Sequence, residues 1–99
     1  KQEFENIALI NNDDEERFEF VIDGLTAIVE YKVKGNDIYL THTEVPQALE
    51  GRGIAAALVE KVLLEINKRG QQVVPLCPYV QSFLKRHPEW ERIVKSDPS

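Results

Sequence analysis

The chain has 99 residues, a formal net charge of −5 and one cysteine, and 42% of its residues are hydrophobic. A chain of this length supports one core, so we expect a single domain over residues 1–99. Its acidic balance argues against nucleic acid or an anionic membrane as a partner, and no apolar run reaches the roughly 18 residues of a membrane-spanning helix. The lone cysteine excludes an internal disulfide framework and favours a reducing, cytoplasmic location.

The first half of the chain alternates apolar and polar residues in the manner of β-strands. We expect a short strand near residues 7–10, followed by strands over residues 17–22, 25–33 and 37–45. Asp23-Gly24 lies between two of these strands and is the residue pair typical of a two-residue type I′ hairpin turn. The acidic run at 11–16 is expected to be a solvated loop. These features predict an antiparallel meander of about four strands.

After Pro46 the hydrophobic pattern changes to a helical period. Apolar residues recur at helical spacing from Ile54 to Ile66, and Gly70 is suited to end this helix. A short buried strand over residues 73–76 follows, and we expect it to return parallel to the strand at 37–45 through a right-handed crossover.

A second helix is expected from Pro78 to about His87. Proline suits the first position of a helix, and Pro88 disfavours its continuation. Trp90, Ile93 and Val94 are then expected to pack a final turn against the body. The predicted fold class is mixed α/β: an antiparallel meander, a helix, a parallel strand and a C-terminal helix.

The turn before the first helix has the letters of a dinucleotide fingerprint, because Gly51–Ala56 fits G-x-G-x-x-G/A. That motif requires a preceding parallel βαβ strand and an acid about 20 residues later, whereas here a meander precedes and no acid lies between Glu65 and Glu89. Positive φ at the glycines still allows main-chain N–H groups to converge on an anion at the helix start, and Arg52 adds a positive charge. We therefore expect either a pyrophosphate-sized cradle or a glycine-rich helix start without a ligand.

The order of these elements resembles the GNAT superfamily of acyl-CoA-dependent N-acetyltransferases, whose pyrophosphate motif is Gln/Arg-x-x-Gly-x-Gly/Ala. The segment from Glu50 to Ala55 matches that motif, with Glu50 where Gln or Arg is usual. Three segments resemble the very small single-domain branch of this superfamily: HTEVP at 42–46, GRGIA at 51–55 and PLCPYVQSFLKRHPEW at 75–90. The resemblance covers residues 17–90.

This resemblance implies that acetyl-CoA binds in a V-shaped opening between the strand that ends near Val45 and the strand that ends near Leu76. Main-chain groups at Glu44 and Val45 would pair with pantetheine, and N–H groups of the glycine turn would hold the pyrophosphate. Arg86, where the superfamily often keeps a basic residue, would meet the 3′-phosphate; the alternative is that Lys85, Arg86 and His87 only complement the dipole of the second helix. The implied cofactor-binding residues are Glu44, Val45, Gly51, Arg52, Gly53, Ile54, Ala55, Ala56, Cys77, Pro78 and Arg86.

Cys77 is the first candidate catalytic residue. It is expected as the N-cap of the second helix, a position that favours a thiolate, and the resemblance places it near the thioester. It is therefore an acyl acceptor, a partner of the departing CoA thiolate, or a structural cysteine. In many GNAT enzymes a tyrosine general acid lies seven residues after this position, where Leu84 stands here. Tyr79 is an alternative acid, although we favour a packing role for it.

His42 and Glu44 are the other candidate catalytic residues. They lie two apart on a strand and share a face unless a bulge intervenes, and a histidine there suits the deprotonation of an amine. A structural histidine is the alternative. No ligand spacing unites His42, Cys77 and His87, so we expect no metal.

The resemblance, taken together with these residues, implies an acetyltransferase that uses acetyl-CoA and an amine, peptide, protein or thiol acceptor. The alternatives are a CoA-binding sensor or adaptor without turnover and an interaction domain with a vestigial cradle.

Overall fold

A computed structural model describes residues 4–95. The elements in chain order are β1 (Ile10–Asn12), the 3₁₀ turn η2 (Asp13–Glu15), β2 (Arg17–Ile22), β3 (Leu25–Lys34), β4 (Asp37–Glu44), η3 (Gln47–Leu49), α1 (Ile54–Arg69), β5 (Gln72–Pro75), α2 (Pro78–Arg86) and η4 (Pro88–Ile93).

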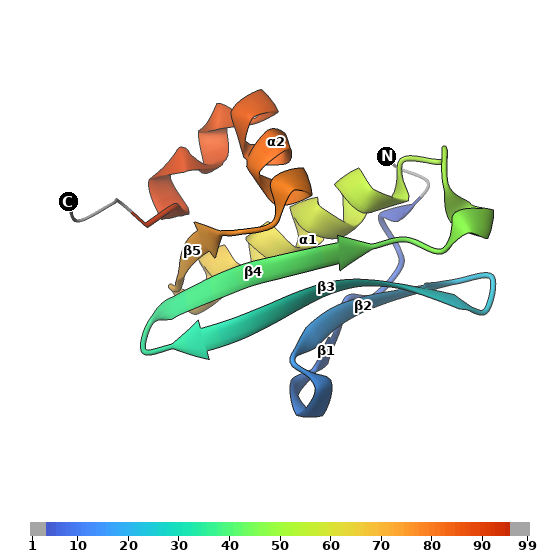
Figure 1. Cartoon of the computed structure of the whole chain (residues 1–99), viewed down its shortest axis with the longest axis horizontal. Helices are drawn as coiled ribbons and strands as arrows, with labels where there is room; N and C mark the ends of the chain where they lie inside the picture. The colour runs from blue at the N-terminus through green and yellow to red at the C-terminus, as the bar shows by residue number, and fades with distance from the viewer. Residues whose placement is uncertain (1–3, 96–99) are drawn as a thin grey trace.

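The sheet has the strand order β1-β2-β3-β4-β5. The first four strands pair antiparallel, and β5 pairs parallel to β4 after the crossover through α1. Helices α1 and α2 contact each other and both cover the same face of the sheet (Figure 1). Within residues 4–95 no helix covers the opposite face. The mixed α/β fold and the order of its main elements are therefore as predicted.

The β2–β3 hairpin turn has the predicted type. Asp23 has φ of 53° and Gly24 has φ of 77°, which is the pair of positive dihedrals that a type I′ turn requires. The β2–β3 turn lies at the end of the sheet where α1 begins (Figure 1).

The prediction for the first strand was wrong in its position. It was expected near residues 7–10, but β1 covers Ile10–Asn12 and the acidic run that follows includes η2. Asn12 explains the shift, because its side chain caps η2 and donates from Nδ2 to Glu19 Oε2 at 3.0 Å. Arg17 Nε donates to the same carboxylate at 2.8 Å. These hydrogen bonds, from Asn12 and then from Arg17, lower the pKa of Glu19. Polar pairing, rather than apolar alternation, fixes this strand.

The remaining boundaries differ from the predictions by one residue: β4 ends at Glu44, β5 covers Gln72–Pro75 and α2 ends at Arg86. The predicted strand over 73–76 ended one residue late, because Pro75 is the last residue paired with β4, although the N–H of Leu76 still donates to Leu40 O. Such single-residue differences are usual at element ends.

The core lies between the sheet and the helices. The apolar stripe of α1 is buried as its spacing predicted, and it packs with aromatic and branched residues of the sheet: Ile54, Leu58, Val59, Val62, Leu63 and Ile66 from the helix, and Phe18, Phe20, Val29 and Leu40 from the strands. Trp90 and Ile93 of η4 are also buried, and Val94 bridges to Val73 of β5. The predicted final turn is thus packed against the body.

Candidate functional site

The glycine turn has the backbone that its sequence predicted. Gly51 has φ of 84° and Gly53, the N-cap of α1, has φ of 78°. A Cβ atom built on either glycine meets no heavy atom within 4 Å, so these positions require glycine for its dihedral freedom and not for space. The N–H of Ala57 donates to Gly53 O, and within the described part of the chain no main-chain acceptor serves the preceding N–H groups of α1.

These N–H groups open onto a cavity of about 160 Å³. It is lined by Val45, Leu49, Glu50, Gly51, Gly53, Ile54, Ala55, Ala56 and Tyr79. Six of the sequence-predicted cofactor residues are therefore brought together, namely Val45, Gly51, Gly53, Ile54, Ala55 and Ala56. Leu49 and Tyr79 were not predicted as binding residues. Leu49 is buried, but it lies in the three-residue turn η3, where neither a helical nor a strand period can single out a residue.

Arg52 does not line this cavity. Its Nη1 lies 3.1 Å from Asp23 Oδ2 of the β2–β3 turn, and its Cζ lies 5.8 Å from the centre of the Phe4 ring. The sequence placed the positive charge of Arg52 inside the cradle, whereas the structure directs this side chain toward the hairpin and the N-terminal segment.

Arg86 is also absent from the lining of this cavity. It lies at the opposite end of α2 from Tyr79, where its Nη1 donates to Ser82 Oγ at 2.9 Å. Its contact with a 3′-phosphate stays a prediction.

The strands β4 and β5 part where the sequence predicted an opening. Their pairing ends at Leu40 and Pro75. The N–H groups of Leu76 and Cys77 both donate to Leu40 O at 3.0 Å, which turns the chain away toward α2. The last four residues of β4, Thr41 to Glu44, therefore have no ladder partner on β5. Among the described residues, no strand therefore pairs with this side of the end of β4, next to Val45.

A β-bulge in β4 decides which side chains face the helices. His42 pairs with Glu30 and Leu40 pairs with Tyr31, which leaves Thr41 as the extra residue. Residues paired across an antiparallel ladder share a face, so Leu40 and the residue after His42 both lie on the side of the helices.

His42 and Glu44 lie together on the uncovered face. His42 Nε2 is 3.4 Å from Glu44 Oε1, and both side chains are more than half exposed, at 53% and 67%. The bulge precedes the pair, so the expectation that they share a face holds. The imidazole of His42 is thus open to an incoming group on this face and has a carboxylate beside it.

Cys77 lies on the other side of β4. Its side chain is buried, with 4% of the residue exposed, and its Sγ is 3.3 Å from Thr43 Oγ1. It is the N-cap of α2, with its carbonyl accepting from the Gln81 N–H at 3.0 Å and Pro78 at the first helical position. The three candidate catalytic residues therefore form two groups, on opposite faces of one strand. Thr43 was missed because its orientation depends on the bulge.

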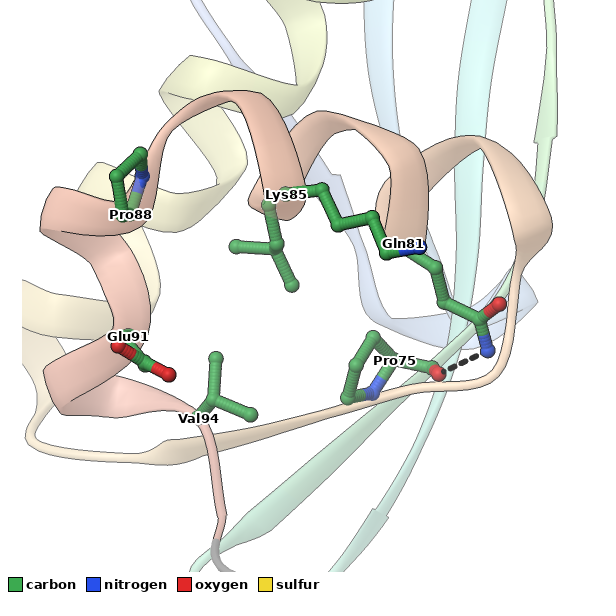
Figure 2. Close-up of a pocket in the computed structure, with 7 residues that line it drawn as sticks. Pro75, Gln81, Lys85, Pro88, Glu91 and Val94 are labelled. Carbon is green, nitrogen blue, oxygen red and sulfur yellow. Dashed lines mark hydrogen bonds between the residues drawn. The ribbon is translucent and has the colours of Figure 1, made fainter.

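A second, larger cavity of about 320 Å³ lies between α2, η4 and the end of β5 (Figure 2). It is lined by Pro75, Gln81, Leu84, Lys85, Pro88, Glu91 and Val94, and it shares no residue with the first cavity. Gln81 Nε2 donates to Pro75 O at 2.9 Å, and the N–H of Lys95 donates to Val73 O at 2.8 Å. These bonds occupy the outer edge of β5, so it does not offer a free ladder to another strand.

No group of three metal-ligating side chains occurs within residues 4–95. None of the helices described there is long and apolar enough to cross a membrane.

A meander, a glycine turn at the start of a crossover helix and an opening between β4 and β5 together define a GNAT-like fold. The family model of the GCN5-related N-acetyl-transferases matches residues 17–93. The chain therefore belongs to the GCN5-related N-acetyltransferase family.

Two curated relatives and one solved structure are similar to this chain. The chain is 38% identical over 63 residues to Protein NATD1 of Bos taurus and 36% identical over 63 residues to that of Homo sapiens, in each case covering 63% of this chain and 56% of the relative. It thus spans just over half the length of these relatives. A GCN5-like candidate N-acetyltransferase from Staphylococcus aureus, solved by NMR, superposes with a TM-score of 0.69 over 94% of this chain and 92% of that one, at 21% identity.

The family implies acetyl-CoA as the cosubstrate. The residues present fit such a ligand. The first N–H groups of α1, which have no main-chain acceptor within residues 4–95, open onto a cavity, and the end of β4 beyond its pairing with β5 continues from it. Glu50 lines the same cavity, and its carboxylate opposes an anion there. The donors in this cavity are thus main-chain N–H groups at a helix start, which favours an anionic ligand.

Proposed function

We propose that this protein transfers the acetyl group of acetyl-CoA to an amine acceptor. The observation that carries the proposal is the cavity at the start of α1, where N–H groups without main-chain acceptors meet the opening between β4 and β5. The helix dipole strengthens anion binding at such a position. Membership of the acetyltransferase family supports the donor.

In this proposal the main chain does most of the binding. The N–H groups of the first turn of α1 hold the pyrophosphate, and Glu44 and Val45 pair through their main chain with pantetheine. Leu49 and Tyr79 form apolar walls of the cavity and exclude water from it. Glu50 stays at the exposed rim, where water screens its charge.

His42 takes the proton that the acceptor amine loses as its nitrogen forms the bond to the acetyl carbon and the carbon–sulfur bond of the donor breaks. Glu44, whose Oε1 lies 3.4 Å from His42 Nε2, orients the imidazole for this transfer. The acceptor then approaches from the uncovered face of the sheet, where a peptide or protein lysine has open access. The alternative acceptor is a thiol, which would take the place of the amine in this step.

Cys77 acts from the covered side. With its Sγ 3.3 Å from Thr43 Oγ1, the thiol donates a proton to the departing sulfur, while Thr43 holds its orientation. The alternative role is an acyl-enzyme, in which the Cys77 sulfur first accepts the acetyl group and the amine then displaces it. Cys77 takes part in the reaction in both roles. The competing interpretation is that Cys77 is only a structural residue.

A non-enzymatic acetyl-CoA sensor or adaptor is the second candidate function. Two observations favour it: Leu84 stands where many relatives have a tyrosine acid, and Cys77 is buried in the core. An interaction domain with a vestigial cradle is the third, and the carboxylate of Glu50 in the cavity is its best support.

Titration with acetyl-CoA by calorimetry tests the proposal. Ala56→Asp places a carboxylate in the cavity within the first turn of α1, where it stabilises the helix by about 0.3–1 kcal/mol while opposing an anion. We expect saturable binding by the wild type and binding weakened at least about tenfold in this variant. Gln47→Glu is the matched control, because it makes the same charge change on exposed η3 outside the cavity lining.

The outcome separates the candidates. An enzyme releases CoA in the presence of amine or lysine-peptide acceptors, and His42→Ala slows this release while binding remains. A sensor binds acetyl-CoA and releases no CoA with any acceptor. If the wild type does not bind at millimolar acetyl-CoA, both CoA functions fail and the interaction domain remains.

A further inference from the structure

The Arg52 side chain connects three segments that are far apart in the sequence. Its Nη1 lies 3.1 Å from Asp23 Oδ2 in the β2–β3 turn, 29 residues away along the chain. Its Cζ lies 5.8 Å from the ring centre of Phe4, which is 2% exposed. The glycine turn is thereby attached to the sheet and to the N-terminal segment.

Both ends of this attachment have unusual backbone. Arg52 is placed between two glycines with φ of 84° and 78°, a segment with little intrinsic preference for one conformation. Asp23 has φ of 53°, which the type I′ hairpin fixes. A flexible turn is thus held by a contact to a rigid one.

We infer that Asp23 is a positioning residue for the acetyl-CoA cradle, and that it acts by anchoring Arg52. This inference rests on the proposed function of the glycine turn. The Asp23–Arg52 pair holds the loop in the conformation in which its N–H groups converge on the cavity, so that less of the binding energy is needed to order the loop. Neither side chain lines the cavity.

The expected change in affinity follows from how exposed the paired side chains are. The Arg52 and Asp23 side chains are 38% and 68% exposed, and pairs of this kind change an equilibrium by about two- to fivefold. A loop that loses this contact populates its binding-competent form less, and the apparent Kd rises by the same factor.

The direction of the effect distinguishes anchoring from direct electrostatics. If Asp23 acted only through its charge, its removal would tighten the binding of an anionic ligand. If it anchors the loop, its removal weakens binding although a negative charge has been lost. Asp23→Asn is suited to this comparison because Asn-Gly is also a preferred type I′ pair, so the hairpin is preserved.

The experiment measures the Kd of acetyl-CoA by calorimetry for the wild type, Asp23→Asn, Arg52→Ala and the double variant. We expect Asp23→Asn to raise the Kd about two- to fivefold, and we expect no such increase when Arg52 is already alanine. Asp14→Asn is the charge control, because it removes an exposed carboxylate on η2, at the opposite end of β2. An unchanged or lower Kd in Asp23→Asn, or an equal increase in the Arg52→Ala background, would overturn the inference.

A second readout does not require the ligand. ¹⁵N relaxation of the free protein should show lower order parameters at Arg52 and Gly53 in Asp23→Asn than in the wild type, with no change at the β3–β4 turn. Unchanged order parameters would contradict the anchoring role. If the wild type fails to bind acetyl-CoA, the proposed function falls, whereas this measurement still decides whether Asp23 orders the loop.

Discussion

Gly53→Ala is the substitution that tests most directly why the turn before α1 contains glycine. Gly53 is the N-cap of α1 with φ of 78°, and a Cβ atom there meets no heavy atom within 4 Å. The added methyl group therefore strains only the main chain. Gly35 in the β3–β4 turn has φ of 59° and equally open surroundings, and it lies at the other end of the sheet (Figure 1). Gly35→Ala is thus a matched control.

An L-residue in this left-handed conformation costs about 1–2 kcal/mol. Two results follow from the two ways in which the chain can respond. If the loop of Gly53→Ala keeps its conformation, the free energy of unfolding falls by that amount, and each kcal/mol lowers the Tm by about 4–8 °C in a domain of this size. If the loop relaxes, stability is retained and the Kd of acetyl-CoA rises by the corresponding factor of about 5–30.

Urea unfolding and acetyl-CoA calorimetry on both variants measure these quantities together. For Gly53→Ala we expect the loss of stability and the loss of affinity to add up to about 1–2 kcal/mol. Gly35→Ala should lose stability alone. The reasoning is refuted if Gly53→Ala changes neither quantity, or if Gly35→Ala weakens acetyl-CoA binding as much as Gly53→Ala does.

Three further predictions concern the core, the acid stability and the thiol. Leu58→Ala should lower the free energy of unfolding by about 2–5 kcal/mol because Leu58 is fully buried, whereas Leu64→Ala on the same helix, 51% exposed, should change it by about 0.5 kcal/mol or less in urea titrations. Folding lowers the pKa of Glu19 from its ordinary value of 4.5. The ionised carboxylate therefore stabilises the folded protein at pH values above 4.5, and this stabilisation is lost as the pH falls through the lowered pKa of the folded state. Glu19→Gln should therefore flatten the fall of Tm with decreasing pH below about 4.5, and parallel Tm profiles would contradict this. Cys77→Ser should keep the wild-type Kd for acetyl-CoA and slow CoA release. An acetyl adduct found by intact-mass measurement on the wild type, and not on this variant, would favour the acyl-enzyme. An unaltered rate of CoA release would show that Cys77 takes no part in the reaction.

Much of the fold could be read from local patterns. The helical period of α1, the alternation in β2 and β3 and the Asp23-Gly24 turn predicted these elements to within a residue, because burial of one face and positive φ leave direct traces in the sequence. The position of β1 was not predictable in this way. Polar hydrogen bonds to Glu19 fix it, and hydrophobic periodicity carries no information about them.

The candidate site likewise has one part that the sequence predicted and another that it did not. The residues of the glycine turn could be assigned from the sequence because the motif is contiguous, and Gly51 and Gly53 adopt the φ values expected of them. The partner of Arg52 could not be assigned, since Asp23 lies on another hairpin. Leu49 and Tyr79 could not be assigned to the cavity either, because they lie on η3 and α2, outside the contiguous motif.

The sequence by itself determined the α/β fold, the family resemblance and the position of the candidate anion cradle, because each could be read from contiguous segments: the periodic elements, three short motifs and the glycine turn. Only the tertiary structure decided that a bulge at Thr41 turns His42 and Glu44 to the open face while Cys77 meets Thr43 on the covered one. One extra residue in a strand reverses the facing of every later side chain, and the need for that residue comes from pairing with a neighbouring strand.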